Sequence, residues 1–340
     1  ICSRNLLSWV FFREMNGVKI VSASRRRASA IFVLLLMLCP VSGCIFPKET
    51  IPENDAQAQD PPLSEPNNLS TQCIEFEGVD RCWTLLVPAT VSTEQPVPLV
   101  LDLHGYGHTS ASQMNISSFA SLAVEEQLIV AYPQGYDSFW GLGFDGIEND
   151  LDDVGFLSAV IESVAEAYPV DEARIHMSGW SNGCKMTQRF AVETQGVVAS
   201  IGCMSGYLMT EAPSTYIAPV PFMEVHGVLD TTVSYADNTA MTVYYFQNTV
   251  GFNKGAMQNL EYWADLNGCS GAAPEVITVN ADYDIRGYSD CTSNAEVRLM
   301  SLFSSGHNPY LSGNPTNTQS TAILWDFMSQ FALETIEDES

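Results

Sequence analysis

Short apolar segments alternate along this chain with longer amphipathic segments, and this alternation limits its fold more than any other feature. The segment 97–105, VPLVLDLHG, is an apolar run ending in glycine, as expected of a strand buried on both faces of a sheet. The segment 153–170 places apolar residues on one face of a helix. Strands that alternate with helices predict the α/β class, a mainly parallel central sheet with helices on both faces.

Other segments extend the same pattern. Further strands are predicted at 128–135, 173–179, 197–206, 219–227 and 295–303. Further helices are predicted at 117–127, 182–193, 257–268 and 320–333. A β-hairpin is predicted at 73–88, with its turn at 78–80.

A serine between two glycines stands where a predicted strand meets a predicted helix. The sequence GWSNG at 179–183 fits G-x-S-x-G, the nucleophile elbow, in which a strained turn exposes the serine hydroxyl at the carboxyl end of a strand. A plain Gly/Ser turn is the alternative, because so short a pattern arises by chance. The flanking strand and helix favour Ser181 as a nucleophile.

A serine nucleophile needs a base and an acid, which follow it along the chain in hydrolases. His307, in SSGHNPY after the last predicted strand, is the histidine in the loop where the base belongs. Asp230, in VLDTT after the strand 219–227, is the predicted acid, and Asp237 is a weaker candidate. Because the base must be neutral, we expect activity to fade below roughly pH 6 to 7.

The oxyanion hole of such a site needs two N–H donors. Asn182, the residue after the nucleophile, and Tyr106, in the loop LDLHGYG, are the predicted donors. We expect His104 to shape that loop and His176 to be a packed core residue.

Aromatic residues near these segments are candidate substrate contacts. Trp180, Trp140 and Tyr106, together with Tyr136, could line an aromatic cleft, and core packing is an equally good reading of each.

The first part of the chain predicts export. Basic residues follow Met15, a plausible true start, and precede the apolar run 31–39 and the sequence VSGC at 41–44, as in a secretory signal. VSGC also resembles a bacterial lipobox with Cys44 as the lipidated residue, and an ordinary cleaved signal is the alternative. We predict a signal region at 1–43, a flexible tether at 44–72 and a catalytic domain at 73–335. The protein would be anchored in the bacterial cell envelope through Cys44, or secreted.

The net charge limits the classes of binding partner, and the cysteine content bears on the cellular compartment. The chain has 40 acidic against 14 basic residues, a net charge of −26, which disfavours nucleic acid as a partner and keeps a protein soluble. Without Cys2, Cys39 and Cys44, six of the nine cysteines remain, and an exported chain can keep disulfides. Their order suggests the pairs Cys73–Cys82, Cys184–Cys203 and Cys269–Cys291, although spacing alone does not determine connectivity.

Acidic residues gather in two places. One cluster lacks the spacing of an EF-hand, so we favour a solvated loop over a calcium site; its members are Asp145, Glu148, Asp150, Asp152 and Asp153. The others, expected to be solvated, are Asp282, Asp284 and Asp290. No metal and no organic cofactor is predicted.

Several motifs together resemble a known family. LHGYG, YPQG, DDVGF, GWSNG, VHGVLDTTVSY, YWADLNGC and GHNPY occur in the order seen in the polyhydroxybutyrate depolymerase/feruloyl esterase-like family of α/β-hydrolases, which is similar to feruloyl and acetylxylan carbohydrate esterases. The resemblance covers about 73–333 and implies Ser181, Asp230 and His307 as the triad. The chain departs from the family pattern at HNPYLSG, at Cys184 and at 234–255, which leaves the substrate in doubt.

These patterns together predict a secreted or surface-anchored serine carboxylic-ester hydrolase. Its substrate would be a polymeric or bulky ester, a polyhydroxyalkanoate-type polyester or a feruloyl or aryl ester, with acetylxylan as the alternative. A non-catalytic polymer-binding surface protein and a peptidase are the other readings. We expect a monomer whose only membrane contact is a lipid on Cys44.

Overall fold

The computed structural model describes residues 67–143, 151–236 and 255–334, which fall within one compact unit, Asp60–Ser340. The predicted signal region, Cys44, most of the predicted tether and the alternative acid Asp237 lie outside the described residues. None of the helices in the described ranges has the length and apolar character that a membrane span requires.

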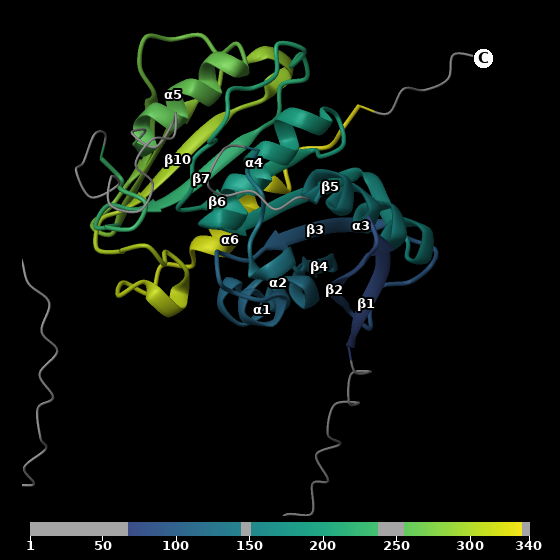
Figure 1. Cartoon of the computed structure of the whole chain (residues 1–340). Helices are drawn as coiled ribbons and strands as arrows, with labels where there is room; N and C mark the ends of the chain where they lie inside the picture. Colours follow the sequence, from purple (N-terminus) through teal and green to yellow (C-terminus); the bar gives the residue numbers. More distant parts are fainter. Residues whose placement is uncertain (1–66, 144–150, 237–254, 335–340) are drawn as a thin grey trace, which may run out of the picture. The chain divides into compact units, whose positions relative to one another are not determined.

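A ten-stranded sheet forms the centre of the domain, in the order β1-β2-β4-β3-β5-β6-β7-β10-β9-β8 (Figure 1). The strands, in chain order, are β1 Asn68–Phe76, β2 Val79–Val87, β3 Val97–Leu103, β4 Ile129–Pro133, β5 Val170–Trp180, β6 Ser200–Met204, β7 Phe222–Gly227, β8 Glu275–Val279, β9 Tyr283–Tyr288 and β10 Val297–Leu302. The central strands from β4 to β10 pair in parallel, and antiparallel strands flank them on both sides. Loops that follow the parallel strands therefore meet at one edge of the sheet.

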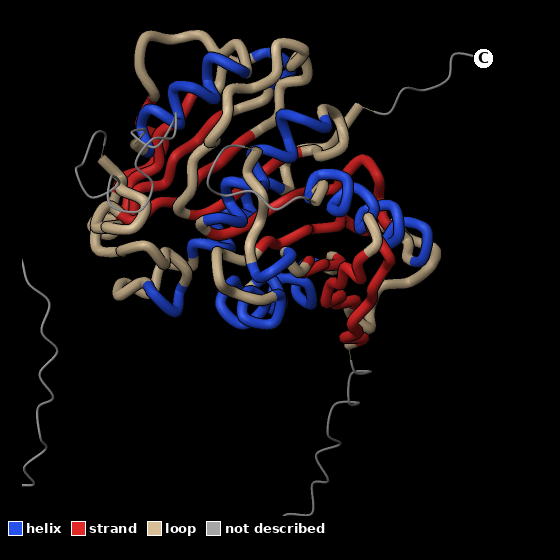
Figure 2. Tube along the Cα trace, viewed as in Figure 1, coloured by secondary structure: helices blue, strands red, loops and turns tan. Residues whose placement is uncertain are grey.

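Helices cover both faces of this sheet, as Figure 2 shows. They are α1 Ser110–Ser117, α2 Phe119–Glu126, α3 Asp153–Ala167, α4 Asn182–Thr194, α5 Ala256–Leu266 and α6 Ser320–Met328. The helices α3, α4 and α5 pack in one hydrophobic cluster, and α2 and α6 pack in a second. The strand β3 supplies both clusters by alternation, with Leu99 and Leu101 in the first and Val100 in the second. The predicted α/β architecture is confirmed.

The structure corrects the sequence analysis in several places. The strand β1 begins at Asn68, so residues 68–72 belong to the domain and not to the tether. The hairpin turns at Glu77 and Gly78, both with positive φ, and not at 78–80. The strands β8 and β9 and the helix α1 were not predicted. On β9, Asp284 is buried and pairs with Arg286 at 2.8 Å, so the expectation that it is solvated is wrong.

The three suggested disulfides are confirmed. Cys73 and Cys82 are directly opposite each other on β1 and β2. Cys184–Cys203 ties α4 to β6, and Cys269–Cys291 links two loops. Three disulfides fit an extracellular protein.

A buried ion pair fastens the start of α3 to β2. Arg81 Nη2 lies 2.6 Å from Asp153 Oδ1, with both side chains at 1% exposure or less. The other carboxylate oxygen of Asp153 accepts from the Gly141 N–H at 2.7 Å. The Arg81 guanidinium stacks 3.9 Å from the Phe156 ring centroid. Asp153, expected in a solvated loop, is therefore a buried structural residue.

We predict that Asp153→Ala lowers the free energy of unfolding by about 3–5 kcal/mol, because it leaves the Arg81 charge buried without its partner. Asp171→Ala, which removes a partly exposed pair with Arg174, is the control and should change stability by about 1 kcal/mol or less. Urea denaturation of both variants measures this. Equal losses in the two variants would contradict the assignment.

Candidate active site

Ser181 stands at the junction of β5 and α4 in a strained backbone conformation. Its φ of 55° and ψ of −113° lie outside the helical and extended regions, as in a nucleophile elbow. The two glycines of the motif have distinct steric roles. A Cβ on Gly179 would lie 2.6 Å from the Gly183 carbonyl carbon, and a Cβ on Gly183 would lie 2.3 Å from the Leu103 carbonyl oxygen. The motif thus lets α4 begin in direct backbone contact with the end of β3.

His307 comes to Ser181 from the loop after β10. Its Nε2 lies 2.9 Å from Ser181 Oγ. The indole of Trp180 donates to the His307 carbonyl oxygen at 2.7 Å, so the residue before the serine also holds the histidine loop. This arrangement lets His307 accept the hydroxyl proton of Ser181.

Asp230 orients the other side of the imidazole. Its Oδ2 lies 2.7 Å from His307 Nδ1, and its Oδ1 accepts from the N–H groups of Thr232 and Val233 at 2.7 and 2.9 Å. Burial alone would raise the pKa of Asp230, but hydrogen bonds and charges from His226 and His307 outweigh it and hold this pKa well below its usual range. The structure therefore brings Ser181, His307 and Asp230 together in one hydrogen-bonded array.

Sequence reasoning missed a second histidine beside the acid. His226 Nε2 lies 3.3 Å from Asp230 Oδ2, and its Nδ1 lies 2.6 Å from Glu224 Oε1. The available signal was the spacing EVHG at the end of a predicted strand, which puts Glu224 and His226 on the same face of β7. His176, in contrast, is a buried core residue bonded to Ser200 on β6, as expected.

The loop after β3 is held by His104. Its Nε2 accepts from the Gly135 N–H at 2.9 Å, so its Nδ1 carries the proton that is donated to the Gly105 carbonyl at 2.8 Å. Burial lowers the pKa of His104 to about 4, which keeps the ring neutral. Because a trans peptide points its C=O and N–H in opposite directions, the Tyr106 N–H faces away from His104. The expected role of His104 in shaping the loop fits this geometry.

The side chain of Asn182 also shapes this region. It accepts from the Trp140 N–H at 2.7 Å and donates to the Trp140 carbonyl at 3.1 Å. Its backbone N–H belongs to the first turn of α4, where N–H groups have no partner within the helix.

Two of the predicted substrate contacts, Trp140 and Trp180, have buried side chains, which fits the alternative of core packing. Trp140 is fully buried and donates its indole N–H to the His104 carbonyl, so it packs the core beneath the loop. Trp180 is only 8% exposed, and its indole N–H donates to the His307 carbonyl oxygen. Tyr106, at 64% exposure, and Tyr136, at 39%, remain accessible to a substrate.

The acidic cluster does not form one site in the described residues. Asp145, Glu148 and Asp150 lie outside them. Asp152 caps α3 by accepting from the Gly155 N–H, and Asp153 pairs with Arg81. Over the described ranges, no group of three or more His, Cys, Asp or Glu side chains is arranged to hold a metal ion.

Comparison with known proteins relates the chain to esterases. No protein-family model matches it. It is 22% identical over 262 residues to the bifunctional acetylxylan esterase/xylanase XynS20E of Neocallimastix patriciarum. The aligned region covers 76% of this chain and 34% of that protein. It is 25% identical over 254 residues to feruloyl esterase B of Piromyces equi. The aligned region covers 72% of this chain and 44% of that protein. The chain thus spans less than half the length of these curated relatives.

A solved structure agrees on the fold. The acetyl xylan esterase from Aspergillus awamori has a TM-score of 0.55 and 16% identity, over 76% of this chain and 99% of that one. At this identity the likeness concerns the fold alone. The chain therefore has the α/β-hydrolase fold, and the curated proteins that it resembles in sequence include feruloyl and acetylxylan esterases.

Proposed function

We propose that this protein is a serine carboxylic-ester hydrolase with Ser181 as nucleophile, His307 as base and Asp230 as acid. One observation carries the proposal: the distances of 2.9 Å from Ser181 Oγ to His307 Nε2 and of 2.7 Å from His307 Nδ1 to Asp230 Oδ2. The strained turn at Ser181 and the esterase names of the curated relatives support it.

The reaction would be two-step acyl transfer. Ser181 Oγ attacks the ester carbonyl while His307 takes its proton, and the imidazolium is stabilised by Asp230. His307 then gives this proton to the leaving alkoxide as the ester C–O bond breaks. In the second step His307 removes a proton from water, whose oxygen attacks the acyl carbon. The bond from that carbon to Ser181 Oγ then breaks, His307 returns the proton to Oγ, and the acid leaves. The triad regenerates itself, so the mechanism uses no cofactor.

The backbone N–H groups of Asn182 and Tyr106 would bind the oxyanion. The first belongs to the start of α4, and the second points away from His104 for the reason given above. Each donor of this kind typically contributes about 3 kcal/mol to transition-state stabilisation.

Esters on plant polysaccharide, feruloyl or acetyl, are the substrate class that the relatives favour. A polyester is the second candidate, because the loops around the array expose apolar side chains to solvent. Tyr106 is 64% exposed, Leu229 beside Asp230 is 60% exposed, and Phe303 after β10 is 36% exposed. Such side chains suit a bulky apolar acyl group. A lipid on Cys44 would hold the enzyme at the cell envelope near such polymers.

Hydrolysis by the full-length protein, beside Ser181→Ala, tests the proposal. The substrates are a short-chain p-nitrophenyl ester, methyl ferulate, acetylated xylan, an emulsified polyester and a peptide amide with the same acyl group as the nitrophenyl ester. We expect Ser181→Ala to lower turnover by about six orders of magnitude. Preference for methyl ferulate or acetylxylan identifies a polysaccharide esterase, and preference for the polyester identifies a depolymerase.

Two outcomes would contradict the proposal. Faster cleavage of the amide than of the ester would favour a peptidase. Binding of a polymer without turnover of any substrate would favour a non-catalytic surface protein.

Gly183→Ala tests whether the backbone contact between α4 and β3 positions the oxyanion donors. Its Cβ would meet the Leu103 and His104 carbonyl oxygens at 2.3 and 2.6 Å, so the first turn of α4 must move. We expect kcat/KM to fall about 100-fold, as for a displacement of about 1 Å. Gly196→Ala, strained by a φ of +75° but free of close contacts, is the control: it should lose stability and keep its activity. Equal activity in both folded variants would exclude this role.

A further inference from the structure

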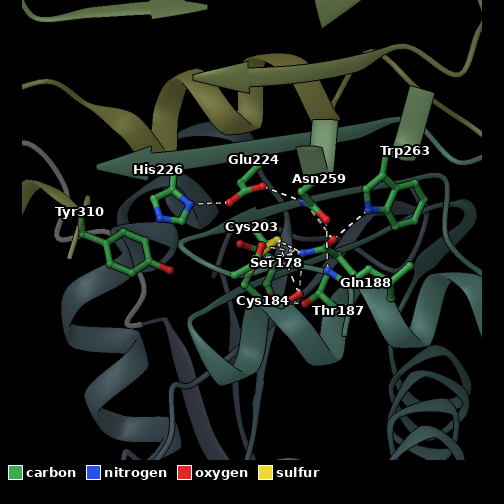
Figure 3. Close-up of a disulfide and its surroundings, with 12 residues drawn as sticks. Ser178, Cys184, Thr187, Gln188, Cys203, Glu224, His226, Asn259, Trp263 and Tyr310 are labelled. Carbon is green, nitrogen blue, oxygen red and sulfur yellow. Dashed lines mark hydrogen bonds and ion pairs between the residues drawn. A yellow bond between two sulfur atoms is a disulfide. The ribbon is translucent and has the colours of Figure 1, made fainter. Parts of the chain in front are cut away.

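Two buried ionisable residues on β7 lie behind the proposed acid and have no part in the mechanism above. Glu224 is 1% exposed and His226 is not exposed at all. Their side chains lie on the same face of β7 and contact each other at 2.6 Å (Figure 3). Buried charges are costly unless they are paired, so the function of this pair needs an explanation.

His226 supports the turn that presents Asp230. Its Nε2 lies 2.8 Å from the Val233 carbonyl oxygen, which can only accept, so Nε2 carries a hydrogen and donates it. The N–H of the same Val233 donates to Asp230 Oδ1 at 2.9 Å. His226 Nε2 also lies 3.3 Å from Asp230 Oδ2, the oxygen that faces His307. One ring nitrogen therefore fixes the turn and faces the carboxylate.

Burial raises the pKa of Glu224, and the hydrogen-bond donors around its carboxylate oppose this effect. Asn259 accepts from the Leu208 N–H through Oδ1, which orients the amide so that Nδ2 donates to Glu224 Oε2 at 2.8 Å. The Gly206 N–H is a further donor. These donors stabilise the charged form of the carboxylate against burial. With both Asp230 and Glu224 beside it, His226 binds a second proton, on Nδ1, and the ring is an imidazolium.

Two further side chains fix this arrangement from α4 and α5. The Trp263 indole can only donate, and it donates to Gln188 Oε1 at 2.8 Å. Gln188 Nε2 is therefore left to donate to the Gly206 carbonyl, also at 2.8 Å. Figure 3 shows this chain of bonds from Trp263 through Gln188 and Asn259 to Glu224 and His226. The pair is held in one geometry by the two helices that pack on this face of the sheet.

We propose that Glu224 and His226 are positioning residues that extend the array Ser181–His307–Asp230, with His226 holding the Asp230 turn through Val233 and placing a positive charge beside the Asp230 carboxylate. This inference rests on the proposed function, because it concerns the same serine. His226 touches neither the serine nor its base, and it acts through Asp230.

The charges around the pair agree with this role. Burial alone would lower the pKa of His226, but hydrogen bonding with Asp230 and Glu224 and their negative charges outweigh it and raise this pKa to about 9. Tyr207 stacks on the His226 ring at 5.3 Å, and Tyr235 meets its edge at 5.8 Å.

A positive charge at His226 also acts on the base. Lys185 on α4 is another cation near Asp230; burial lowers its pKa to about 8, and the negative charge of Asp230 opposes this. Loss of the His226 charge makes His307 protonate more readily, because the negative potential of Asp230 is then less balanced. The acid limb of the pH–activity profile, where activity falls as His307 is protonated, therefore moves to higher pH.

Two substitutions at one position separate geometry from charge. His226→Gln places an amide N–H where Nε2 was, so it keeps the bond to the Val233 carbonyl and loses the charge. His226→Asn places its amide near the Nδ1 position and cannot reach Val233. We expect His226→Gln to keep kcat within a few-fold and to shift the acid limb upward by about one pH unit. We expect His226→Asn to lower kcat by about tenfold or more with little change in KM, because Asp230 loses its support.

The matched control is His176→Gln, which removes another fully buried histidine, hydrogen-bonded to Ser200 on β6. It should lower stability and leave kcat and the pH profile unchanged. Each rate is divided by the concentration of folded protein, measured by circular dichroism, so that partial unfolding does not count as lost activity.

The readout is the rate of Ser181 phosphonylation by an alkyl fluorophosphonate between pH 4 and 9, measured beside hydrolysis of the preferred ester. Phosphonylation needs an activated serine and no knowledge of the substrate. Wild-type labelling without ester hydrolysis would refute the proposed function and still test the positioning role. Wild-type rates and pH profiles in both His226 variants, with only a lower melting temperature, would overturn the inference. So would failure of wild-type Ser181 to react at all.

Discussion

The close contact between the first turn of α4 and the end of β3 is the constraint on which the rest of the site depends. It places the serine turn against the loop that follows β3, and only a residue without a side chain fits at Gly183. The neighbouring strands β5, β6, β7 and β10 are parallel, so the loops that carry Ser181, Asp230 and His307 end at the same edge of the sheet. Strand direction and this one backbone contact therefore bring the three loops of the triad to the same place.

The acidic half of the array is supported differently from the nucleophile. Ser181 is held by a strained backbone turn, whereas Asp230 is held by hydrogen bonds from Thr232 and Val233 and by the charge at His226. A carboxylate in a buried place would ordinarily favour its neutral form. Donors on both of its oxygens reverse this preference. One layer deeper, Asn259 and His226 also supply donors to Glu224, but burial has the larger effect there and raises the pKa of Glu224.

The sequence predicted the elements whose signals are local. G-x-S-x-G at a junction of strand and helix and the apolar central strands each depend on a few adjacent residues, and the structure has both. The helix α1 was missed because SASQMNIS has no apolar stripe and begins through a capping box at Thr109. The strand β8, at the edge of the sheet, is mostly exposed, and β9 beside it has Asp284 and Arg286 within its six residues. Both strands were missed because neither forms a long apolar run. The roles of Trp140 and Trp180 could not be predicted, because a tryptophan gives the same sequence signal whether its side chain lines a cleft or packs in the core.

The Glu224–His226 pair shows why residues that support a site are harder to predict from sequence than the catalytic residues themselves. The triad residues follow strand ends, a position visible in the sequence. The support for the pair comes from Gln188 on α4, and from Asn259 and Trp263 on α5, which are far apart in the chain and meet only when both helices pack on the sheet. Cys184–Cys203 fixes α4 to β6 one turn before Gln188, so the disulfide and the polar chain restrain the same helix. The helix that carries the nucleophile at its start thus also anchors the residues behind the acid, which couples the two ends of the array through one rigid element.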